Sequence, residues 1–324
     1  MLDLLIIGGS AAATTAGIYA ARRNLNFKIV SKDFGGEVAT SGEIGNWPGI
    51  QKIDGIELSK QFQEHLESYG VKPDLGVWVE KIHKNDDGTF SISTKKKGEP
   101  ERGVKVNGNG NGNPTYDYEA KAVIVVTGVH PRSLDVSGEK EFRGKGVTYC
   151  TTCDGPLFQG KVTATIGGGN SALESSIMMA GIAKKHYIIN KNPQFKGDKV
   201  LLEKISKLDN VEIIYNALTS EIIGEQFVTG LKYKDTETNE EKQLDVEGIM
   251  VHIGMVPNSG IVPDEVEKNK FGEIVVNTRA ETNVPGLYAA GDVSDIPFKQ
   301  IVIAAGQGAT AVLSVIEYVN RLEK

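Results

Sequence analysis

The chain repeats one local pattern twice, and this repeat constrains the fold more than any other feature of the sequence. In the first copy, an apolar run at residues 4–7 leads into a glycine turn at 8–10, an alanine-rich segment at 11–23 and a second apolar run at 27–30. The second copy spans residues 162–189. Strand, tight turn, helix and strand in this order form a βαβ unit. The repeat therefore predicts an α/β protein with two Rossmann-like dinucleotide-binding domains.

The first glycine turn is the kind of site that binds the pyrophosphate of a dinucleotide. Backbone N–H groups at the start of the following helix point at the phosphates, and the helix dipole favours negative charge. The usual G-x-G-x-x-G fingerprint is only partly present, because Ser10 and Ala13 stand where glycine is normal. Both substitutes are small, and the Ser10 hydroxyl could itself bond a phosphate. We expect Gly8, Ser10 and Ala11 to bind a dinucleotide, with an ordinary strand-to-helix turn as the alternative.

The second glycine turn matches G-x-G-x-x-A and predicts a second dinucleotide site, or a scaffold that keeps its shape. The residues expected at this site are Gly167, Gly169, Asn170, Ser171, Asn190 and Lys191. A site that selects NADPH surrounds the 2′-phosphate with arginine forks. Here Asn190, Lys191 and Lys196 follow the second strand, and residues 144–278 contain no arginine. Lysine neutralises a phosphate without bidentate geometry, so NADPH is a disfavoured donor.

The chain has only two cysteines, Cys150 and Cys153, and an acid, Asp154, follows them directly. A structural disulfide framework needs more cysteines at wider spacing. A zinc site needs two further ligands, and the five histidines show no paired spacing, so we expect no metal. Thiolate exchange needs an attacking thiolate and a proton for the leaving thiolate. We therefore predict a redox-active disulfide between the two cysteines, with two unremarkable thiols as the alternative.

Composition excludes several classes of function. Of 324 residues, 40% are hydrophobic and 24% are charged, and the formal net charge is −6. This balance gives no basic field for nucleic acid or an anionic membrane. The apolar residues 4–7 lack a basic flank and run into a glycine turn, so we expect a buried first strand and not a signal peptide. A cytoplasmic protein without nucleic-acid or membrane partners follows.

Two further segments stand outside the repeat. Residues 286–292 have the pattern of a buried strand that ends in a turn with an acid, and a last helix with small residues is expected to begin near Lys299. The Asn-Gly run at 107–113 lies between alternating segments at 89–94 and 116–120. This arrangement predicts a β-hairpin with a long tip. We interpret the tip as a solvated insertion and assign it no function.

These features occur together in one known family. The chain resembles the low-molecular-weight thioredoxin reductases of bacteria and archaea over nearly its whole length. The Cys-x-x-Cys-Asp-Gly and Ala-Ala-Gly-Asp-Val segments are the most specific parts of the resemblance. The segments that match are residues 6–21, 35–37, 46–49, 126–128, 150–155, 166–172, 282–293 and 299–300.

The resemblance implies a domain organisation. It implies the FAD/NAD(P)-binding fold, a three-layer ββα architecture in which the second domain is inserted into the first. A discontinuous FAD-binding domain would comprise residues 1–130 and 248–324. A pyridine-nucleotide-type domain with the redox Cys-x-x-Cys pair would comprise residues 131–247. The resemblance also implies a homodimer and a thioredoxin-like protein substrate.

It further implies roles for individual residues. Reduced FAD would pass electrons to the Cys150–Cys153 disulfide, Cys150 would attack the partner's disulfide, and Asp154 would be the general acid. Cys153 would lie next to the flavin. The positions implied to contact FAD are Gly8, Ser10, Ala11, Gly36, Glu37, Asn46, Thr127, Gly128, Gly291, Asp292, Lys299, Gln300 and Ile301.

The chain departs from the family pattern at three places, of which the first is Ser10 and Ala13 in the first glycine turn. Glu37 stands where glutamine is usual, and residues 189–191 replace the family's His-Arg-Arg element. NADH, NADPH, a reduced ferredoxin and a deazaflavin are therefore all candidate donors. Two other functions stay open: a related flavin disulfide oxidoreductase that serves a peroxidase or small-dithiol partner, and a flavin-binding module whose cysteines are structural.

Overall fold

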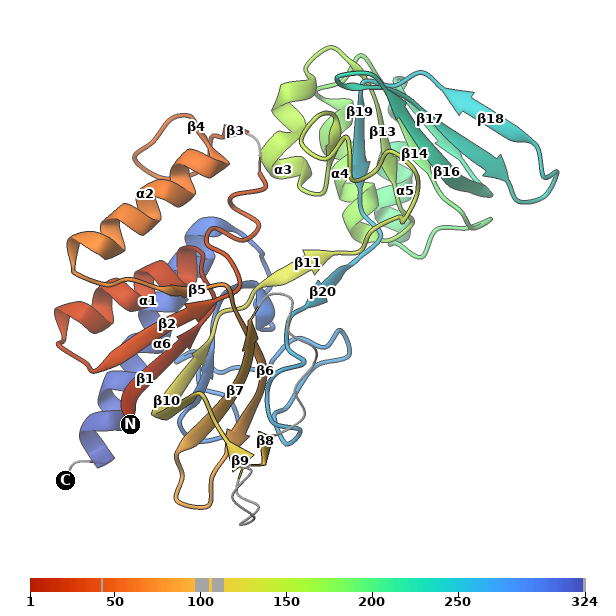
Figure 1. Cartoon of the computed structure of the whole chain (residues 1–324). Helices are drawn as coiled ribbons and strands as arrows, with labels where there is room; N and C mark the ends of the chain where they lie inside the picture. Colours follow the sequence, from red (N-terminus) through yellow and green to blue (C-terminus); the bar gives the residue numbers. More distant parts are fainter. Residues whose placement is uncertain (42, 97–104, 107–113, 323–324) are drawn as a thin grey trace. The chain divides into compact units, whose positions relative to one another are not determined.

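The computed structural model describes residues 1–41, 43–96, 105–106 and 114–322 and divides into two compact units. The first unit comprises Met1–Thr40, Trp47–His130 and Val256–Lys324, and the second comprises Ser41–Asn46 and Pro131–Met255. The chain crosses between them at β11 (Val129–Pro131) and β20 (Met255–Pro257), which pair with each other. The first unit is thus built from both ends of the chain (Figure 1).

The first unit contains a seven-stranded sheet in the order β5-β2-β1-β10-β7-β6, and β21 also pairs with β10. The pairs β2–β5, β1–β2, β1–β10 and β10–β21 are parallel, whereas β7 runs antiparallel to β6 and β10. The strands of this sheet are β1 (Leu2–Ile7), β2 (Phe27–Ser31), β5 (Asp74–Leu75), β6 (Val77–Lys84), β7 (Phe90–Lys96), β10 (Tyr118–Val125) and β21 (Leu287–Ala289).

Side chains of β1 alternate between two apolar layers. Leu4 and Ile6 are buried with the helices α1 (Ala11–Arg22) and α6 (Ile301–Leu322), whereas Leu5 and Ile7 are buried on the opposite face. A parallel strand that is covered on both faces needs such a continuous apolar run. The alternation confirms the expected buried first strand and gives the layered α/β architecture.

The remaining elements of the first unit lie around this sheet. The helix α2 packs against α1 through Leu66. The β7–β10 pairing confirms the hairpin expected around residues 89–120, whose tip at 107–113 lies outside the described residues. These elements are β4 (Ile53–Asp54), α2 (Gly55–Ser68), β8 (Lys105–Val106), β9 (Pro114–Thr115) and η2 (Gly291–Val293).

The second unit contains a five-stranded parallel sheet in the order β12-β19-β13-β14-β15 and a three-stranded antiparallel sheet, β16-β17-β18. Its helices are α3 (Thr151–Asp154), η1 (Gly155–Phe158), α4 (Asn170–Ala180) and α5 (Lys199–Ile205). Its strands are β3 (Glu43–Ile44), β12 (Val147–Thr148), β13 (Val162–Ile166), β14 (Lys185–Ile189), β15 (Val211–Ile214), β16 (Ala217–Gly224), β17 (Val228–Asp235), β18 (Glu241–Leu244) and β19 (Gly248–Val251).

The expected domain boundary after residue 247 falls too early. The strand β19 pairs with both β12 and β13, so it lies inside the sheet of the second unit. All four of its residues are buried. Removing β19 would leave the facing edges of β12 and β13 without their hydrogen-bond partners, and the chain therefore leaves the second unit only after Met255.

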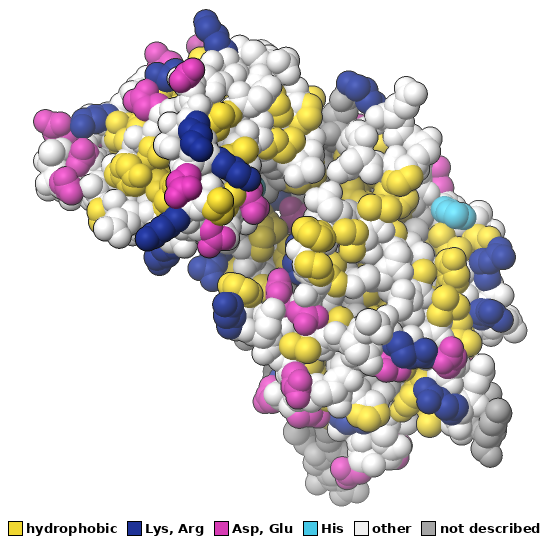
Figure 2. Space-filling model, turned by 180° about the vertical axis from the view of Figure 1, so that it is seen from behind, with side chains coloured by type: hydrophobic (Ala, Val, Ile, Leu, Met, Phe, Trp, Pro, Cys, Tyr) yellow, Lys and Arg dark blue, Asp and Glu magenta, His cyan; other side chains and the backbone are white. Residues whose placement is uncertain are grey.

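Charges of both signs are mixed on the surface of the protein. Lysine and arginine side chains are interspersed with aspartate and glutamate on the face drawn in Figure 2.

The helix α6 begins two residues after Lys299, as expected, and is long and apolar enough to cross a membrane by length and composition. One side of it, including Val312 and Val315, lies in the core of the first unit, as is common for core helices.

Candidate active site

The first glycine turn leaves no room for side chains at Gly8 and Gly9. Gly8 has a φ of +137°, and a Cβ there would collide with the carbonyl oxygen of Val126. A Cβ on Gly9 would lie 2.5 Å from the carbonyl oxygen of Asp33. The turn lies at the carboxyl end of β1, next to the carboxyl ends of β2 and β10. Ligands of open α/β sheets bind at this edge.

Ser10 performs a different task from the one expected of its hydroxyl. Its backbone is extended and precedes α1. Its Oγ donates a 2.6 Å hydrogen bond to the carbonyl oxygen of Gly35, and the N–H of Gly35 donates to the carbonyl oxygen of Gly9. The single hydroxyl hydrogen is therefore directed at the loop of Gly35 and Gly36 and not at a phosphate. Gly36 has a φ of +55° and lies beside Ser10.

Asp292 brings an unsatisfied carboxylate oxygen to the same edge of the sheet. It lies in η2, directly after β21, and its Oδ1 is buried without a hydrogen-bond partner in the described structure. Burial raises the pKa of Asp292 to about 6, Lys299 opposes the rise, and Glu37 and Glu273 add to it. Buried polar atoms are normally satisfied, so this oxygen fits a site where a ligand hydroxyl donates. The tight glycine turn and this oxygen together fit the pyrophosphate and the hydroxylated chain of FAD.

The other residues expected to contact FAD are distributed over both units. Lys299 donates to the Ser294 carbonyl oxygen at 2.6 Å and pairs with Glu273 at 2.9 Å, so it is anchored behind Asp292. The N–H of Gly291 donates to Oε1 of Gln307. Three more expected positions lie in the first unit: Thr127 donates to the carbonyl oxygen of Asn258, Gly128 has a φ of +66°, and Ile301 begins α6. Asn46 belongs to the segment that groups with the second unit.

The two cysteines form the predicted disulfide. Cys150 precedes the single turn of α3 and Cys153 lies within it, with Cα atoms 5.3 Å apart. The N–H groups of Cys153 and Asp154 both donate to the carbonyl oxygen of Cys150, which closes the turn. The spacing of three residues thus brings the two sulfurs together within one helical turn.

Asp154 is connected to Cys150 through a residue that the sequence did not single out. The hydroxyl of Thr148 donates a short hydrogen bond to Oδ2 of Asp154 and accepts one from the N–H of Cys150 at 3.2 Å. A second unpredicted residue is Glu139, which is buried and accepts a 2.7 Å hydrogen bond from the hydroxyl of Tyr149. Neither belongs to a recognisable motif, so the sequence offered no signal for them.

The second glycine turn has the expected geometry. The polar side chains at this turn and after β14 are hydrogen-bonded within the protein. Gly167 has a φ of +151° and lies against the carbonyl oxygen of His252. The Asn190 side chain donates to the Gln194 carbonyl oxygen and accepts from the N–H of Asn192. Asn170 and Asp198 exchange two hydrogen bonds of 2.8 and 2.9 Å. Both asparagines are therefore engaged by the protein itself, whereas Lys191 is exposed.

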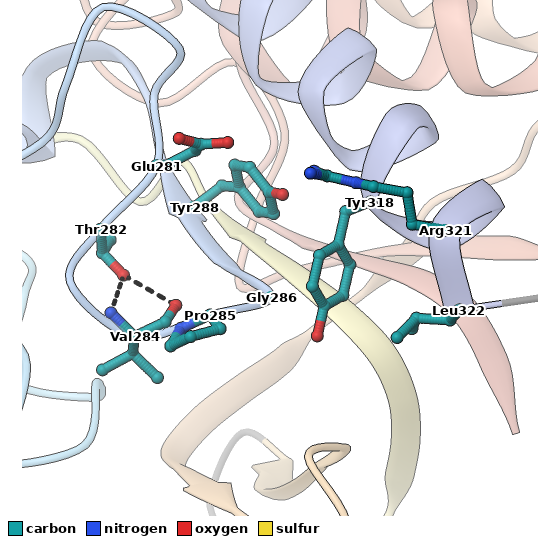
Figure 3. A pocket seen from close by; sticks show the side chains of 9 residues that line it. All are labelled: Glu281, Thr282, Val284, Pro285, Gly286, Tyr288, Tyr318, Arg321 and Leu322. Carbon is teal, nitrogen blue, oxygen red and sulfur yellow. Dashed lines mark hydrogen bonds between the residues drawn. The ribbon is translucent and has the colours of Figure 1, made fainter.

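A cavity of about 430 Å³ in the first unit is separate from these sites. Its lining includes Tyr288, Tyr318 and Arg321, and Figure 3 shows the two tyrosine side chains beside the β21 strand and α6. The residues that precede β21 form its other wall, so it lies at the opposite end of this strand from Asp292. No group of three or more His, Cys, Asp or Glu side chains among the described residues is placed to hold a metal ion.

Comparison with known proteins identifies the family. The chain belongs to the pyridine nucleotide-disulphide oxidoreductase family, whose model matches residues 2–308. It is 39% identical over 319 residues to a protein named NADH dehydrogenase from Bacillus subtilis (strain 168). It is 40% identical over 320 residues to a Pseudomonas putida protein named as an alkyl hydroperoxide reductase subunit. The matches cover 98% of this chain but only 59% and 58% of the two relatives, so the chain spans about three fifths of their length.

Solved structures extend the comparison. A thioredoxin reductase from Streptococcus pyogenes MGAS5005 matches with a TM-score of 0.86 and 32% identity, covering 99% of both chains. T. acidophilum thioredoxin reductase matches with a TM-score of 0.63 and 38% identity, again over 99% of both chains. The chain is thus a member of the pyridine nucleotide-disulphide oxidoreductase family with a thioredoxin-reductase-like fold, a Cys150–Cys153 disulfide and FAD as its cofactor.

Proposed function

We propose that the chain is an FAD-dependent thioredoxin-disulfide reductase. It would pass electrons from a reductant through FAD and the Cys150/Cys153 dithiol to a thioredoxin-like protein. The first unit would bind FAD, and the second would supply the dithiol and a pyridine-nucleotide-type fold. The observation that carries the proposal is the Cys150–Cys153 disulfide with Asp154 hydrogen-bonded to the same turn through Thr148. The likeness to thioredoxin reductases over 99% of the chain supports it.

Bound FAD would supply the two electrons that convert the disulfide to the dithiol. The Cys150 thiolate then attacks one sulfur of the partner's disulfide, which forms a mixed disulfide and releases a partner thiolate. Asp154 gives its proton to that leaving thiolate. The Cys153 thiolate attacks Cys150, which restores the Cys150–Cys153 disulfide and releases the second partner thiolate. One disulfide is reduced for each disulfide formed, so electrons balance.

Anaerobic reduction of the FAD-loaded protein tests the dithiol directly. Titration with dithionite should consume about four electrons per chain, because flavin and disulfide each accept two. The Cys150→Ser and Cys153→Ser variants should each consume about two. Cys150→Ser should also abolish reduction of a thioredoxin-like partner while flavin reduction by the donor persists. Full partner turnover by this variant would exclude Cys150 as the attacking thiol.

A second function has a specific observation in its favour. Relatives named as alkyl hydroperoxide reductase subunits are 39–40% identical over 98% of this chain. The same dithiol could therefore serve a peroxidase partner. Parallel assays with a thioredoxin and with a peroxiredoxin-type protein as the only acceptor decide between them. Turnover of the peroxidase partner alone would replace the proposed function with this second one.

The donor and the assembly belong to the same proposal. Because residues 144–278 contain no arginine, we propose NADH, a reduced ferredoxin or a deazaflavin as donors ahead of NADPH. Anaerobic bleaching of the flavin by each donor in parallel would identify the one used. We also propose a cytoplasmic homodimer. Light scattering of the FAD-loaded protein would contradict the dimer if the mass equalled that of one 34.9 kDa chain.

A further inference from the structure

A row of polar side chains lies beneath the dithiol turn in the second unit. Thr151, the residue between the cysteines that begins α3, is 4% exposed. Its Oγ1 lies 2.6 Å from Oγ of Ser175 and 2.7 Å from Nε2 of His252. Ser175 lies in turn 3.0 Å from Oγ1 of Thr165. Side chains from α4 and from the segment after β19 therefore contact one hydroxyl of the Cys-x-x-Cys sequence, and β13 extends the row through Ser175.

The His252 end of this row is held by its own backbone. Its N–H donates to the carbonyl oxygen of Ile166 at 2.8 Å, and its carbonyl oxygen packs directly against Gly167. Burial lowers the pKa of His252 to about 4, so the imidazole is neutral at physiological pH. A neutral imidazole has one donor and one acceptor nitrogen, and either tautomer can bond the Thr151 hydroxyl. The ring is thus a fixed, uncharged anchor.

The dithiol turn needs such an anchor, because α3 contains only four residues. One helical turn is not stable by itself, since its nucleation cost is not repaid by further hydrogen bonds. Anchoring Thr151 restricts the backbone between Cys150 and Cys153. A restricted backbone keeps the two sulfurs close in the reduced protein and thereby favours closure of the disulfide.

We propose that His252 is a positioning residue for the dithiol, and that through Thr151 it sets the equilibrium between the Cys150/Cys153 dithiol and its disulfide. The inference rests on the proposed redox role of the two cysteines. Without the anchor, the reduced turn gains conformational freedom that the disulfide form lacks. The reduced form is then favoured, and the dithiol becomes a weaker reductant.

The test measures this equilibrium in the full FAD-loaded chain. Wild type, His252→Ala, His252→Gln and Thr151→Val are equilibrated with oxidised and reduced dithiothreitol, quenched with an alkylating reagent and counted by mass. The equilibrium constant for disulfide formation should fall about 3–10-fold in His252→Ala and Thr151→Val, where tenfold corresponds to about 30 mV. The double variant should fall no further than Thr151→Val alone, because that change already removes the hydrogen bond to His252 together with the one to Ser175. His252→Gln should stay within about twofold of wild type, since its amide can bond the same hydroxyl.

His186→Ala is the matched control. His186 is fully buried in the same unit and pairs with Thr163 and Ser176, away from the cysteines. The His186→Ala variant should be less stable than wild type yet keep the wild-type equilibrium constant for disulfide formation. An equal shift in His186→Ala would mean that the effect is general loosening and would overturn the proposal.

The remaining outcomes separate this inference from the proposed function. If His252→Ala does not fold, Thr151→Val tests the same hydroxyl with little change of volume. If the wild-type cysteine pair titrates normally and Thr151→Val leaves the equilibrium constant for disulfide formation unchanged, the proposed role of His252 and Thr151 is overturned. A wild type in which no thiol pair titrates would contradict the proposed function itself, and the role of His252 with it.

Discussion

Asp292 is a buried carboxyl whose protonation should make the stability of the FAD-free protein depend on pH. Its pKa is raised from 3.8 to about 6, mainly by burial. An acid with a raised pKa binds more protons in the folded state than in the unfolded chain. Its contribution to stability is therefore present below about pH 4 and is lost as the pH rises through about 6. The expected loss is about 3 kcal/mol.

Asp292→Asn isolates this effect, because the amide cannot ionise. The difference in unfolding free energy between wild type and variant should change by about 2 kcal/mol between pH 4 and pH 7, with the variant relatively more stable at pH 7. Urea denaturation of both FAD-free proteins across this range measures it. A difference that stays constant with pH would show that Asp292 is ionised throughout.

Asp154 is expected to act as the proton donor of the exchange steps. Asp154→Asn keeps the size of the side chain and can still hydrogen-bond Thr148, but it has no transferable proton. Partner reduction should slow by ~10²-fold or more, while reduction of the flavin by the donor is unchanged. Single-turnover rates of the two half-reactions measure this. An unchanged exchange rate would leave Asp154 with a structural role only.

The residues recovered from the sequence are those that lie in continuous motifs. Cys150 and Cys153 are three residues apart, and their pairing is a local property that the sequence contains. Thr148 and His252 act through contacts to the same segment, but His252 is about 100 residues away along the chain. The direction of the Ser10 hydroxyl depends on Gly35, whose position is set by the folded loop. Contacts between distant segments need the tertiary structure, which no local pattern specifies.

At the scale of elements, α6 packs against α1 through a glycine. A Cβ at Gly308 would collide with the backbone of Ala12, whereas Gly306, also in α6, faces open space. Gly308→Ala should lower the unfolding free energy by about 1–3 kcal/mol and weaken FAD retention, because α1 must shift. Gly306→Ala is the control and should raise the unfolding free energy by up to about 1 kcal/mol, because alanine has a higher helix propensity than glycine. Thermal unfolding and flavin release report both. Equal effects of the two changes would contradict the close packing.

The loop after β14 should decide which donor is used. The 2′-phosphate of NADPH needs planar guanidinium groups. Asn190 is buried and engaged with its own loop, and only lysines are available nearby. Two missing charge-assisted bonds correspond to about 10²–10⁴-fold weaker NADPH binding. We expect kcat/KM for NADPH to be no higher than for NADH with the same partner.

Asn190→Arg combined with Lys191→Arg should raise the use of NADPH if the loop still folds. A wild type that strongly prefers NADPH would show that Lys191 and Lys196 suffice. If neither nucleotide bleaches the flavin in wild type or variant, the second glycine turn is a retained scaffold, and electrons enter from a protein or a deazaflavin.

The sequence predicted the βαβ elements because apolar runs, glycine turns and alanine-rich helices are local signals. The family resemblance placed the end of the second domain before β19, and only the pairing of this strand with β12 and β13 assigns it to the second unit. The antiparallel strands β16, β17 and β18 carry no glycine motif either, and the repeat did not predict them.

At the scale of the whole molecule, the repeat predicted two dinucleotide-type units, and the structure contains a sheet with parallel strand pairs in each. How the chain divides between them was visible only through the family resemblance. The pairing of β10 with β21 joins residues about 160 positions apart, and no periodicity in the sequence records such a pairing. The first unit is therefore discontinuous because of how its strands pair, and this pairing is visible only in the folded structure.

That discontinuity has a consequence during synthesis. Apart from residues 41–46, the second unit is one continuous stretch, and all of it is made before β21 and α6. It can complete its sheet while the chain is still growing, since domains fold as units during synthesis. The first unit must wait, because residues 123–125 of β10 still lack their partner β21 and the apolar side of the sheet that α6 covers is open. A ribosome that stalls once residue 255 has left the exit tunnel would thus present a folded dithiol unit attached to an unfinished FAD unit.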